Sequence, residues 1–292
     1  LLNNVAKMKK DTPLGSRIAE VHNGSSLFTG DAGSGESNAR RYLIESDLVE
    51  AIIALPENMF YNTGIGTYIW VLSNRKEERR KGKIQLIDAT AMKSPLRKNM
   101  GKKNCELTEE IRAEILRIFM EMEESEVSKI FNNEEFGYWA VTVERPLRLR
   151  VFPERNIPDS VFRNADERVE YEQAINKLPK DVPLDDWMAF AKATKLKAAL
   201  LKKVRPYITE KDPTAKPIDG EPDPDLRDTE IVPFTYEGGI EAFMKNEVLP
   251  YAPEAWVDEK KTQIGYEISF TKYFYKPVEL RSLDEILADL KA

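Results

Sequence analysis

Residues 1–90 contain short apolar runs with the length of β-strands, separated by more polar segments. The runs are rich in β-branched and aromatic residues, which favour extended structure. The run at 49–54 is almost continuously apolar, as in a strand that is buried on both faces. We therefore expect four strands, at residues 17–22, 49–54, 67–73 and 84–88.

Helical periodicity accompanies these strands. Residues 1–10 have the pattern of a helix that ends before a turn, and residues 36–45 that of an amphipathic helix. The N-cap of the second helix is expected at Ser37 or Asn38. Its apolar stripe consists of Ala39, Tyr42 and Leu43.

The order of these elements indicates an α/β sheet, because strands, a glycine-rich loop and a helix alternate along the chain. The strands at 67–73 and 84–88 flank residues 76–83, of which seven are charged. A short charged connection between neighbouring strands favours an antiparallel hairpin with a solvated tip. We expect this hairpin to form the edge of the sheet.

The pattern changes beyond residue 90. Residues 89–105 are basic and predict a loop, and Thr108 is placed to cap a helix. Residues 206–225 contain five prolines and predict a linker or an extended wrapping segment. Extended structure is expected at 136–152, and helices at 165–178, 184–204, 240–249 and from Ser282 onward. The expected domains are 1–90 (sheet), 91–205 (helical and extended middle region), 206–230 (linker) and 231–292 (C-terminal region).

Composition narrows the classes of function. The 292 residues include 44 Lys and Arg against 50 Asp and Glu, which gives a net charge of −6. Proteins that bind DNA alone usually carry a basic surplus, so any DNA contact must come from local basic patches or from a partner. No apolar run approaches the ~20 residues of a membrane helix. The chain begins at Leu1, and we expect it to be a fragment or a processed chain.

Cysteine and histidine usage excludes further chemistries. Cys105 is the only cysteine, so there is no disulfide framework and no zinc site built from cysteines, which favours a cytoplasmic setting. His22 is the only histidine, and no other residue accompanies it at ligand spacing. We expect no metal site, and we interpret His22 as a strand-end residue with local hydrogen bonds.

Two glycine-containing segments could carry function. Gly30, Gly33 and Gly35 have the spacing Gly-x-x-Gly-x-Gly, which fits neither a dinucleotide fingerprint nor a P-loop. They form either an ordinary loop or a loop at the edge of a substrate or cofactor site. Residues 60–67 (FYNTGIGT) join two predicted strands. They form either a tight turn whose aromatic rings cap the core, or a platform on which an extruded base stacks.

Residues 17–74 (RIAEVHNGSSLFTGDAGSGESNARRYLIESDLVEAIIALPENMFYNTGIGTYIWVLSN) resemble the second half of the catalytic domain of type I restriction-modification methyltransferase subunits. The segments LRDTEIVPF, EVLPYAPEAWVDEKKTQIGYEISFTKYFY and RSLDEILADL resemble the tail of that family. The resemblance implies the C-terminal half of a Rossmann-like methyltransferase sheet, with parallel strands and an antiparallel edge hairpin. A mostly helical α+β tail would follow.

The resemblance also implies an activity. Such subunits transfer a methyl group from S-adenosylmethionine to adenine N6 in DNA. Their cofactor loop and their Asn-Pro-Pro-aromatic motif both precede the region that resembles residues 17–74. No Asn-Pro-Pro occurs in this chain, so we expect no catalytic residue here and no activity of the chain alone. FTGDAGSG lies downstream of both motifs in the family order and is not taken as the cofactor loop.

The resemblance also implies which residues would form the site. Phe60 or Tyr61 would face the extruded adenine, and the turn through Asn62, Thr63 and Gly64 would shape that wall. A second segment at the substrate edge would contain Asn23, Ser25 and Phe28. In an open α/β sheet the carboxyl ends of the strands face the ligand.

Contacts with DNA and with other subunits complete the expectations. Candidate phosphate contacts are Arg40, Arg41, Arg148 and Arg150. The final apolar stripe, expected as a subunit contact, is Leu283, Ile286, Leu287 and Leu290. Implied partners are a specificity subunit, a second methyltransferase subunit and a restriction subunit. The alternatives are a non-enzymatic DNA-binding or assembly module, and a methyltransferase that acts on RNA or protein.

Overall fold

The computed structural model describes residues 1–275, which form two compact units. Of the described residues, the first unit contains 1–140, 232–239 and 263–275; the second contains Val141–Ile231 and Ile240–Thr262. The boundary at Ala140 differs from the expected one at residue 90, because residues 91–140 pack with the first unit. Among residues 1–275, no helix combines the length and apolar character needed to cross a bilayer.

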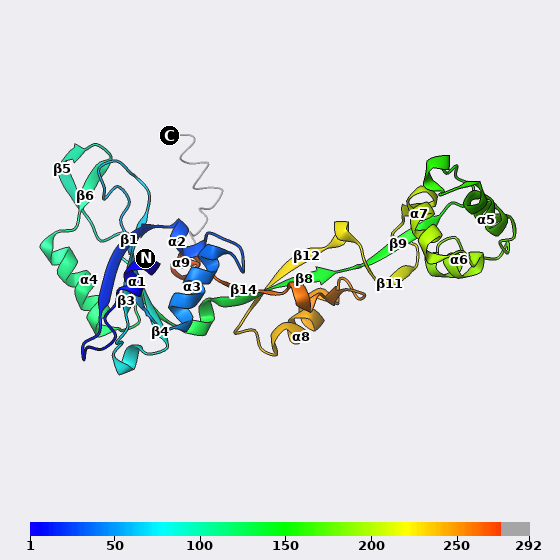
Figure 1. Cartoon of the computed structure of the whole chain (residues 1–292). Helices are drawn as coiled ribbons and strands as arrows, with labels where there is room; N and C mark the ends of the chain where they lie inside the picture. The colour runs from blue at the N-terminus through cyan, green and yellow to red at the C-terminus, as the bar shows by residue number, and fades with distance from the viewer. Residues whose placement is uncertain (276–292) are drawn as a thin grey trace, which may run out of the picture. The chain divides into compact units, whose positions relative to one another are not determined.

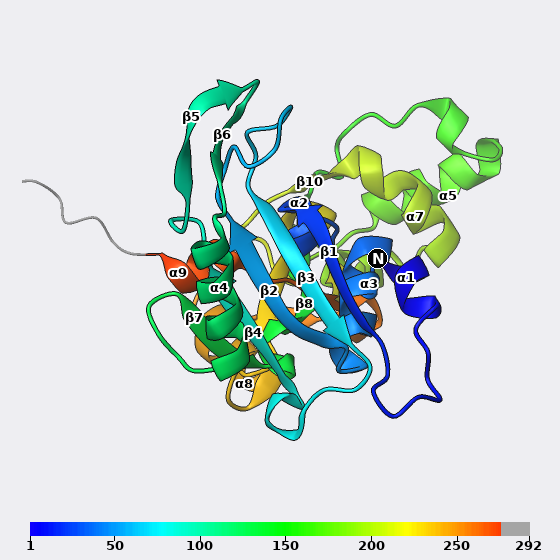
Figure 2. The same ribbon diagram turned by 90° about the vertical axis from the view of Figure 1, so that its left-hand side faces the viewer.

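The first unit is built on a five-stranded sheet with the order β1-β3-β2-β4-β7. Figure 1 labels β1, β3 and β4 of this sheet, and Figure 2 labels all five strands. β3 is antiparallel to both of its neighbours, whereas β2 and β4 are parallel. All seven residues of β2 are buried, as its apolar sequence predicts. The strands are β1 (Arg17–Asn23), β2 (Val49–Leu55), β3 (Thr67–Ser73), β4 (Lys83–Asp88) and β7 (Ser128–Asn132).

The expected hairpin of β3 and β4 is wrong, because β2 lies between these two strands. The charged connection at 76–83 is largely exposed, as expected, and two of its cations are the exceptions. The Arg80 guanidinium is buried and donates to the carbonyl oxygen of Phe119. The side chain of Lys76 is 2% exposed, and its Nζ lies 2.5 Å from a carboxylate oxygen of Asp47. An ion pair and a carbonyl contact thus hold these two cations inside the fold.

Helices cover both faces of the sheet (Figure 2). On one face, α4 (Glu109–Glu121) packs Ile115, Ile118 and Phe119 against β2 and β4. Its N-cap is Thr108, as expected, and the Thr108 hydroxyl accepts a hydrogen bond from the Ile111 amide. A three-layer α/β/α unit results.

On the other face lies α3 (Gly35–Glu45), capped by Ser34 rather than by Ser37 or Asn38. Its buried side chains are Ser37, Arg40, Leu43 and Ile44, whereas Tyr42 is 52% exposed. The helix is therefore rotated relative to the expected apolar stripe. Buried polar side chains do not show in an apolar periodicity, which explains the difference.

These polar side chains hold a strand from the far end of the sequence. The Tyr266 amide donates to Ser37 Oγ at 3.1 Å, and Arg40 Nε donates to the Tyr266 carbonyl oxygen at 2.6 Å. Tyr266 belongs to β14 (Gln263–Tyr266), which pairs with β8 (Gly137–Glu144). Tyr266, Ile268 and Phe270 are buried in the core beneath α3, and α9 (Phe270–Phe274) follows.

The basic segment expected as a loop contains a hairpin of β5 (Ser94–Met100) and β6 (Lys103–Glu106). Gly101 connects the two strands with a φ of +62°, a conformation that favours glycine. Two short helices, α1 (Leu2–Ala6) and α2 (Ser25–Phe28), complete this part of the first unit.

The second unit contains a small sheet in which β9 (Pro146–Val151) lies between β10 (Thr209–Lys211) and β11 (Pro217–Pro222). The proline-rich segment is thus not a linker. Pro217 and Pro222 are tolerated because β11 is an edge strand, where a missing amide costs little. The expected helix at 184–204 is divided at Lys195, which has a φ of +56°. The remaining elements are α5 (Ala165–Asn176), α6 (Trp187–Thr194), α7 (Ala198–Ile208), β12 (Asp228–Pro233), α8 (Gly239–Phe243) and β13 (Trp256–Val257).

Candidate functional site

The strand order brings three chain segments to one edge of the first unit's sheet. β1, β2 and β4 run in the same direction, so their last residues, Asn23, Leu55 and Asp88, lie at the same edge. Thr67, the first residue of β3, pairs with Asn23 on one side and with Leu55 on the other. The aromatic turn and α2 both start at this edge, which is where open α/β sheets bind ligands.

The aromatic turn displays its rings to solvent. Phe60 is 39% exposed and Tyr61 is 58% exposed, and Ile65 beside them is 54% exposed. The turn is closed by a β-bridge between Phe60 and Thr63, and the Thr63 hydroxyl accepts from the Ile65 amide at 3.3 Å. Because the rings are exposed, capping of the core does not account for them. Stacking against a flat ligand is the use that this exposure favours.

The β5–β6 hairpin fixes this turn from outside the sheet, and Figure 2 shows the two side by side. Four successive residues, 102–105, donate to backbone carbonyl oxygens of residues 57–61, where the chain enters the turn. The contacts are Lys102 N to Tyr61 O (2.9 Å), Lys103 Nζ to Met59 O (3.0 Å), Asn104 N to Asn58 O (3.1 Å) and Cys105 Sγ to Glu57 O (3.2 Å). The rings are therefore carried on a braced segment, although no regular sheet pairing exists there.

The second predicted segment lies at the end of β1. Asn23 and Ser25 line a cavity of about 270 Å³ together with His22, Arg40 and Trp70. The Ser26 hydroxyl accepts from Trp70 Nε1 at 3.1 Å and donates to the Asn23 carbonyl oxygen at 2.9 Å, which fixes the backbone of α2. Phe28 is 57% exposed and does not line this cavity. His22 Nε2 lies 3.1 Å from a Glu20 carboxylate oxygen, in line with a local structural role.

The glycine loop packs against the chain itself. The Gly33 amide donates to the Ile264 carbonyl oxygen at 3.2 Å. A Cβ at Gly33 would lie 2.5 Å from Gln263 Oε1, and Gly30 and Gly33 both have positive φ values. The glycines therefore serve close packing against β14, which supports the interpretation as a structural loop.

Arg40 is misplaced among the candidate phosphate contacts. It is 3% exposed, and burial lowers its pKa. Its Nε and Nη1 donate to the carbonyl oxygens of Tyr266, Thr29 (2.8 Å) and Ser26 (3.3 Å). The expectation is wrong for this residue, because a phosphate on the surface of DNA has no access to a guanidinium that already holds the fold together.

The other three candidate arginines already have carboxylate partners. Arg41 Nε lies 2.9 Å from Glu45, and Arg148 pairs with Glu254. Arg150 Nε donates to Asp212 at 2.5 Å. Hydrogen bonds from Thr214 and Arg150 lower the pKa of Asp212 to about 2. Phosphate contact by these three arginines stays a prediction, in competition with an existing ion pair.

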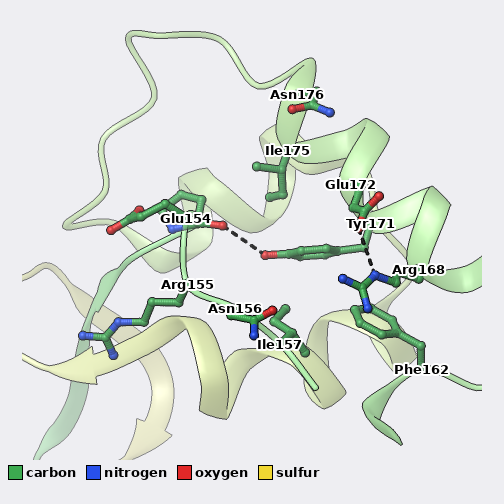
Figure 3. Close-up of a pocket in the computed structure, with 11 residues that line it drawn as sticks. Glu154, Arg155, Asn156, Ile157, Phe162, Arg168, Tyr171, Glu172, Ile175 and Asn176 are labelled. Carbon is green, nitrogen blue, oxygen red and sulfur yellow. Dashed lines mark hydrogen bonds and ion pairs between the residues drawn. The ribbon is translucent and has the colours of Figure 1, made fainter. Parts of the chain in front are cut away.

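A second cavity, of about 390 Å³, lies in the second unit and gave no signal in the sequence (Figure 3). Tyr171 lies at its centre and donates from its hydroxyl to the Pro153 carbonyl oxygen at 3.5 Å. Arg168 Nε lies 2.9 Å from Glu172, and Arg155 pairs with Glu210 at 2.6 Å. Both arginines of the cavity are thus engaged within the chain.

The expected subunit contact lies outside the described residues: Leu283, Ile286, Leu287 and Leu290.

Comparison with known proteins shows similarity to DNA methylases. Residues 5–144 match the family model described as N-6 DNA Methylase. A type I restriction enzyme methylase subunit, MjaVII of Methanocaldococcus jannaschii, is 39% identical over 74 residues, covering 25% of this chain and 12% of the relative. The MjaIX methylase subunit of the same organism is 34% identical over 107 residues, covering 37% of this chain and 18% of the relative.

Further similarities are shorter or more distant. The HindI methylase subunit of Haemophilus influenzae is 44% identical over 54 residues, which cover 18% of this chain and 12% of the relative. A crystal structure of a type I methyltransferase subunit from Streptococcus thermophilus is 26% identical, covers 41% of this chain and 24% of that one, and has a TM-score of 0.35. The chain thus spans less than a fifth of the length of these curated relatives. Residues 5–144, a little under half of the chain, are thus similar to the N-6 DNA methylase family.

Proposed function

We propose that this chain forms the target-base side of a DNA adenine-N6 methyltransferase, the modification subunit of a type I restriction-modification system. The observation that carries the proposal is the braced aromatic turn. Within the family-matched residues, Phe60 and Tyr61 stand exposed at the carboxyl edge of the sheet. An enzyme that modifies a base must take it out of the stack, and an aromatic face can replace the stacking that is lost.

The methyl donor in this proposal is S-adenosylmethionine, and the residues of this chain do not fit a complete site for it. The glycine-rich loop at residues 30–35 packs on β14 and is followed by Glu36. We therefore assign this chain no contact with the cofactor. DNA, a specificity subunit, a second methyltransferase subunit and a restriction subunit are the partners in the proposal, and the cytoplasm is its setting.

The proposal divides the chemistry between this chain and residues outside it. The adenine amine is a poor nucleophile because its lone pair is delocalised into the ring. Hydrogen-bond acceptors must hold its two hydrogens so that the nitrogen faces the methyl group. The family supplies these acceptors from an Asn-Pro-Pro-aromatic run, which is absent from the 292 residues. We propose that this chain holds the ring of the adenine and is inactive by itself.

Methyl transfer tests the proposal. Radiolabelled S-adenosylmethionine and DNA are incubated with this chain alone and with the full-length methyltransferase subunit that contains it. We expect transfer only by the full-length subunit. Its Phe60→Ala and Tyr61→Ala variants, assayed separately, should identify the stacking ring by a loss of about 10- to 100-fold in kcat/KM, since stacking contributes ~1–3 kcal/mol per base.

The matched control is Tyr251→Ala, because Tyr251 is 88% exposed and lies in the second unit. This variant should transfer methyl groups at the rate of the unsubstituted enzyme. Methylation of DNA by the 292 residues alone would contradict the proposed division of chemistry. Unchanged kcat/KM in both the Phe60→Ala and the Tyr61→Ala variants would contradict the assignment of the base wall.

A further inference from the structure

We propose that the β5–β6 hairpin holds the sugar-phosphate backbone of DNA next to the base that the aromatic turn receives. The inference rests on the proposed function and adds a second binding element to it. Residues 93–105 contain five cations and no carboxylate. This density of positive charge stands out in a chain with a net charge of −6.

Four of the five cations of this segment are exposed, and no carboxylate among the described residues pairs with them. Lys93, Arg97, Lys98 and Lys102 are all exposed. Within residues 1–275, none of them has a carboxylate within ion-pair distance, whereas Lys81 pairs with Glu78 at 2.6 Å in the other basic run. These four cations thus remain available to attract phosphate.

The hairpin is also fixed relative to the base wall. Its backbone donates to the carbonyl oxygens of Tyr61 and Asn58, and Lys103 Nζ lies 6.0 Å from the centre of the Tyr61 ring. At Gly101 the hairpin comes so close that an added Cβ would lie 2.6 Å from the Tyr61 carbonyl oxygen. A base received by the rings has its own phosphates within a nucleotide's length of this surface, which suits lysine and arginine side chains.

DNA binding as a function of salt tests this inference. Anisotropy of a labelled duplex is titrated with the 292-residue chain and with an Arg97→Gln, Lys98→Gln, Lys102→Gln triple variant. We expect the variant to bind at least tenfold more weakly at low salt. The slope of log K against log salt should fall by about 0.9 for each of the three cations that contacts a phosphate.

The control variant changes the charge by the same amount elsewhere. Lys180→Gln, Lys192→Gln and Lys202→Gln remove three exposed lysines of the second unit. The control should bind DNA with unchanged affinity and slope, and both variants should keep the thermal midpoint of the unsubstituted chain. Equal losses in both variants, unchanged binding by the hairpin variant, or no binding by the unsubstituted chain would overturn the inference. Tighter binding of duplex RNA than of DNA would overturn the assignment to DNA.

The experiments distinguish a failure of the proposed function from a failure of the inference about the hairpin. The methyl-transfer test measures the effect of substituting Phe60 and Tyr61. It does not depend on the lysines of the hairpin, because these lysines are not stacking groups. If the hairpin variant binds DNA normally while kcat/KM still falls in a Phe60 or Tyr61 variant, only the inference about the phosphates is contradicted. If kcat/KM does not change in the Phe60 and Tyr61 variants while the hairpin variant lowers the salt slope as expected, the assignment of the base wall is contradicted instead.

Discussion

Arg40 and Arg41 are neighbours in the sequence and have opposite roles in the structure. Arg40 is buried and donates to three carbonyl oxygens, whereas Arg41 forms a surface ion pair one helical turn from its partner. A buried cation is stable only when its donors are engaged, because its desolvation is otherwise uncompensated. At the scale of single residues, the environment rather than the residue type decides the role of an arginine.

Alanine substitution measures this difference. Arg40→Ala removes the donor from the buried Tyr266 carbonyl oxygen and from the partly buried ones of Ser26 and Thr29. We expect it to lower the free energy of unfolding by about 3 kcal/mol. Arg41→Ala removes an exposed i,i+4 pair and should cost only about 0.4 kcal/mol. Urea denaturation followed by circular dichroism gives both values. Similar small losses in the two variants would show that Arg40 does not hold β14 in place.

Gly101 provides a test of how the hairpin is braced. Gly101→Ala is destabilised in two ways. The alanine must adopt a left-handed backbone conformation, and its Cβ would lie 2.6 Å from the Tyr61 carbonyl oxygen. Gly82→Ala is the matched control, since its φ is +68° and nothing lies within 4 Å of the added Cβ. The control should lose about 1 kcal/mol of stability, and Gly101→Ala more than about 2 kcal/mol. Hydrogen exchange of the Lys102 amide should accelerate in Gly101→Ala alone; equal exchange in both variants would argue against the brace.

At the scale of elements, local sequence patterns locate most helices and strands. β3 has the predicted bounds, and α4 begins at the predicted cap, because β-branched runs and capping hydroxyls act on the residues beside them. The pairing of the strands could not be predicted in the same way. The position of β2 between β3 and β4 depends on which apolar faces can be buried together, and this information is spread over residues distant in the chain.

Helix α5 contains an ionisable group that tests its packing. Burial, with the nearby Glu154 carboxylate, raises the pKa of Tyr171 from 10.0 to about 12. The fold therefore favours the neutral ring, so this contribution to stability is present below pH 10 and is lost as the pH rises towards 12. In Tyr171→Phe the free energy of unfolding should fall less steeply over this interval. Tyr251→Phe, at an exposed position, should follow the unsubstituted protein; identical slopes in all three proteins would contradict the packing.

At the scale of the whole molecule, the first unit is assembled from three separate stretches of chain. Tyr266, Ile268 and Phe270 come from the third stretch and are 4%, 0% and 6% exposed in its core. Burial of such side chains contributes ~1.5–3 kcal/mol each, so the three together approach the ~5–15 kcal/mol that stabilise a typical domain. The family-matched residues 5–144 are thus not a complete folding unit.

Truncation tests this conclusion. A chain that ends at Ala140 should lose its cooperative thermal transition, or show one at a much lower midpoint, because the core beneath α3 is left open. A second chain, in which flexible linkers replace residues 141–231 and 240–262, keeps all three stretches and should retain the transition. Differential scanning calorimetry compares them. Equal midpoints would mean that the third stretch contributes little to the first unit.

The sequence by itself determined the α/β class of the first unit, most of its elements and the position of the aromatic turn between two strands. These features follow from side chains acting on their neighbours or from a continuous motif. Only the tertiary structure decided that Arg40 is internal, that β5 and β6 brace Phe60 and Tyr61, and that β14 closes the core under α3. The physical reason is that burial and hydrogen-bond partnership depend on groups brought together from distant positions, such as Arg40 and Tyr266, which no local pattern records.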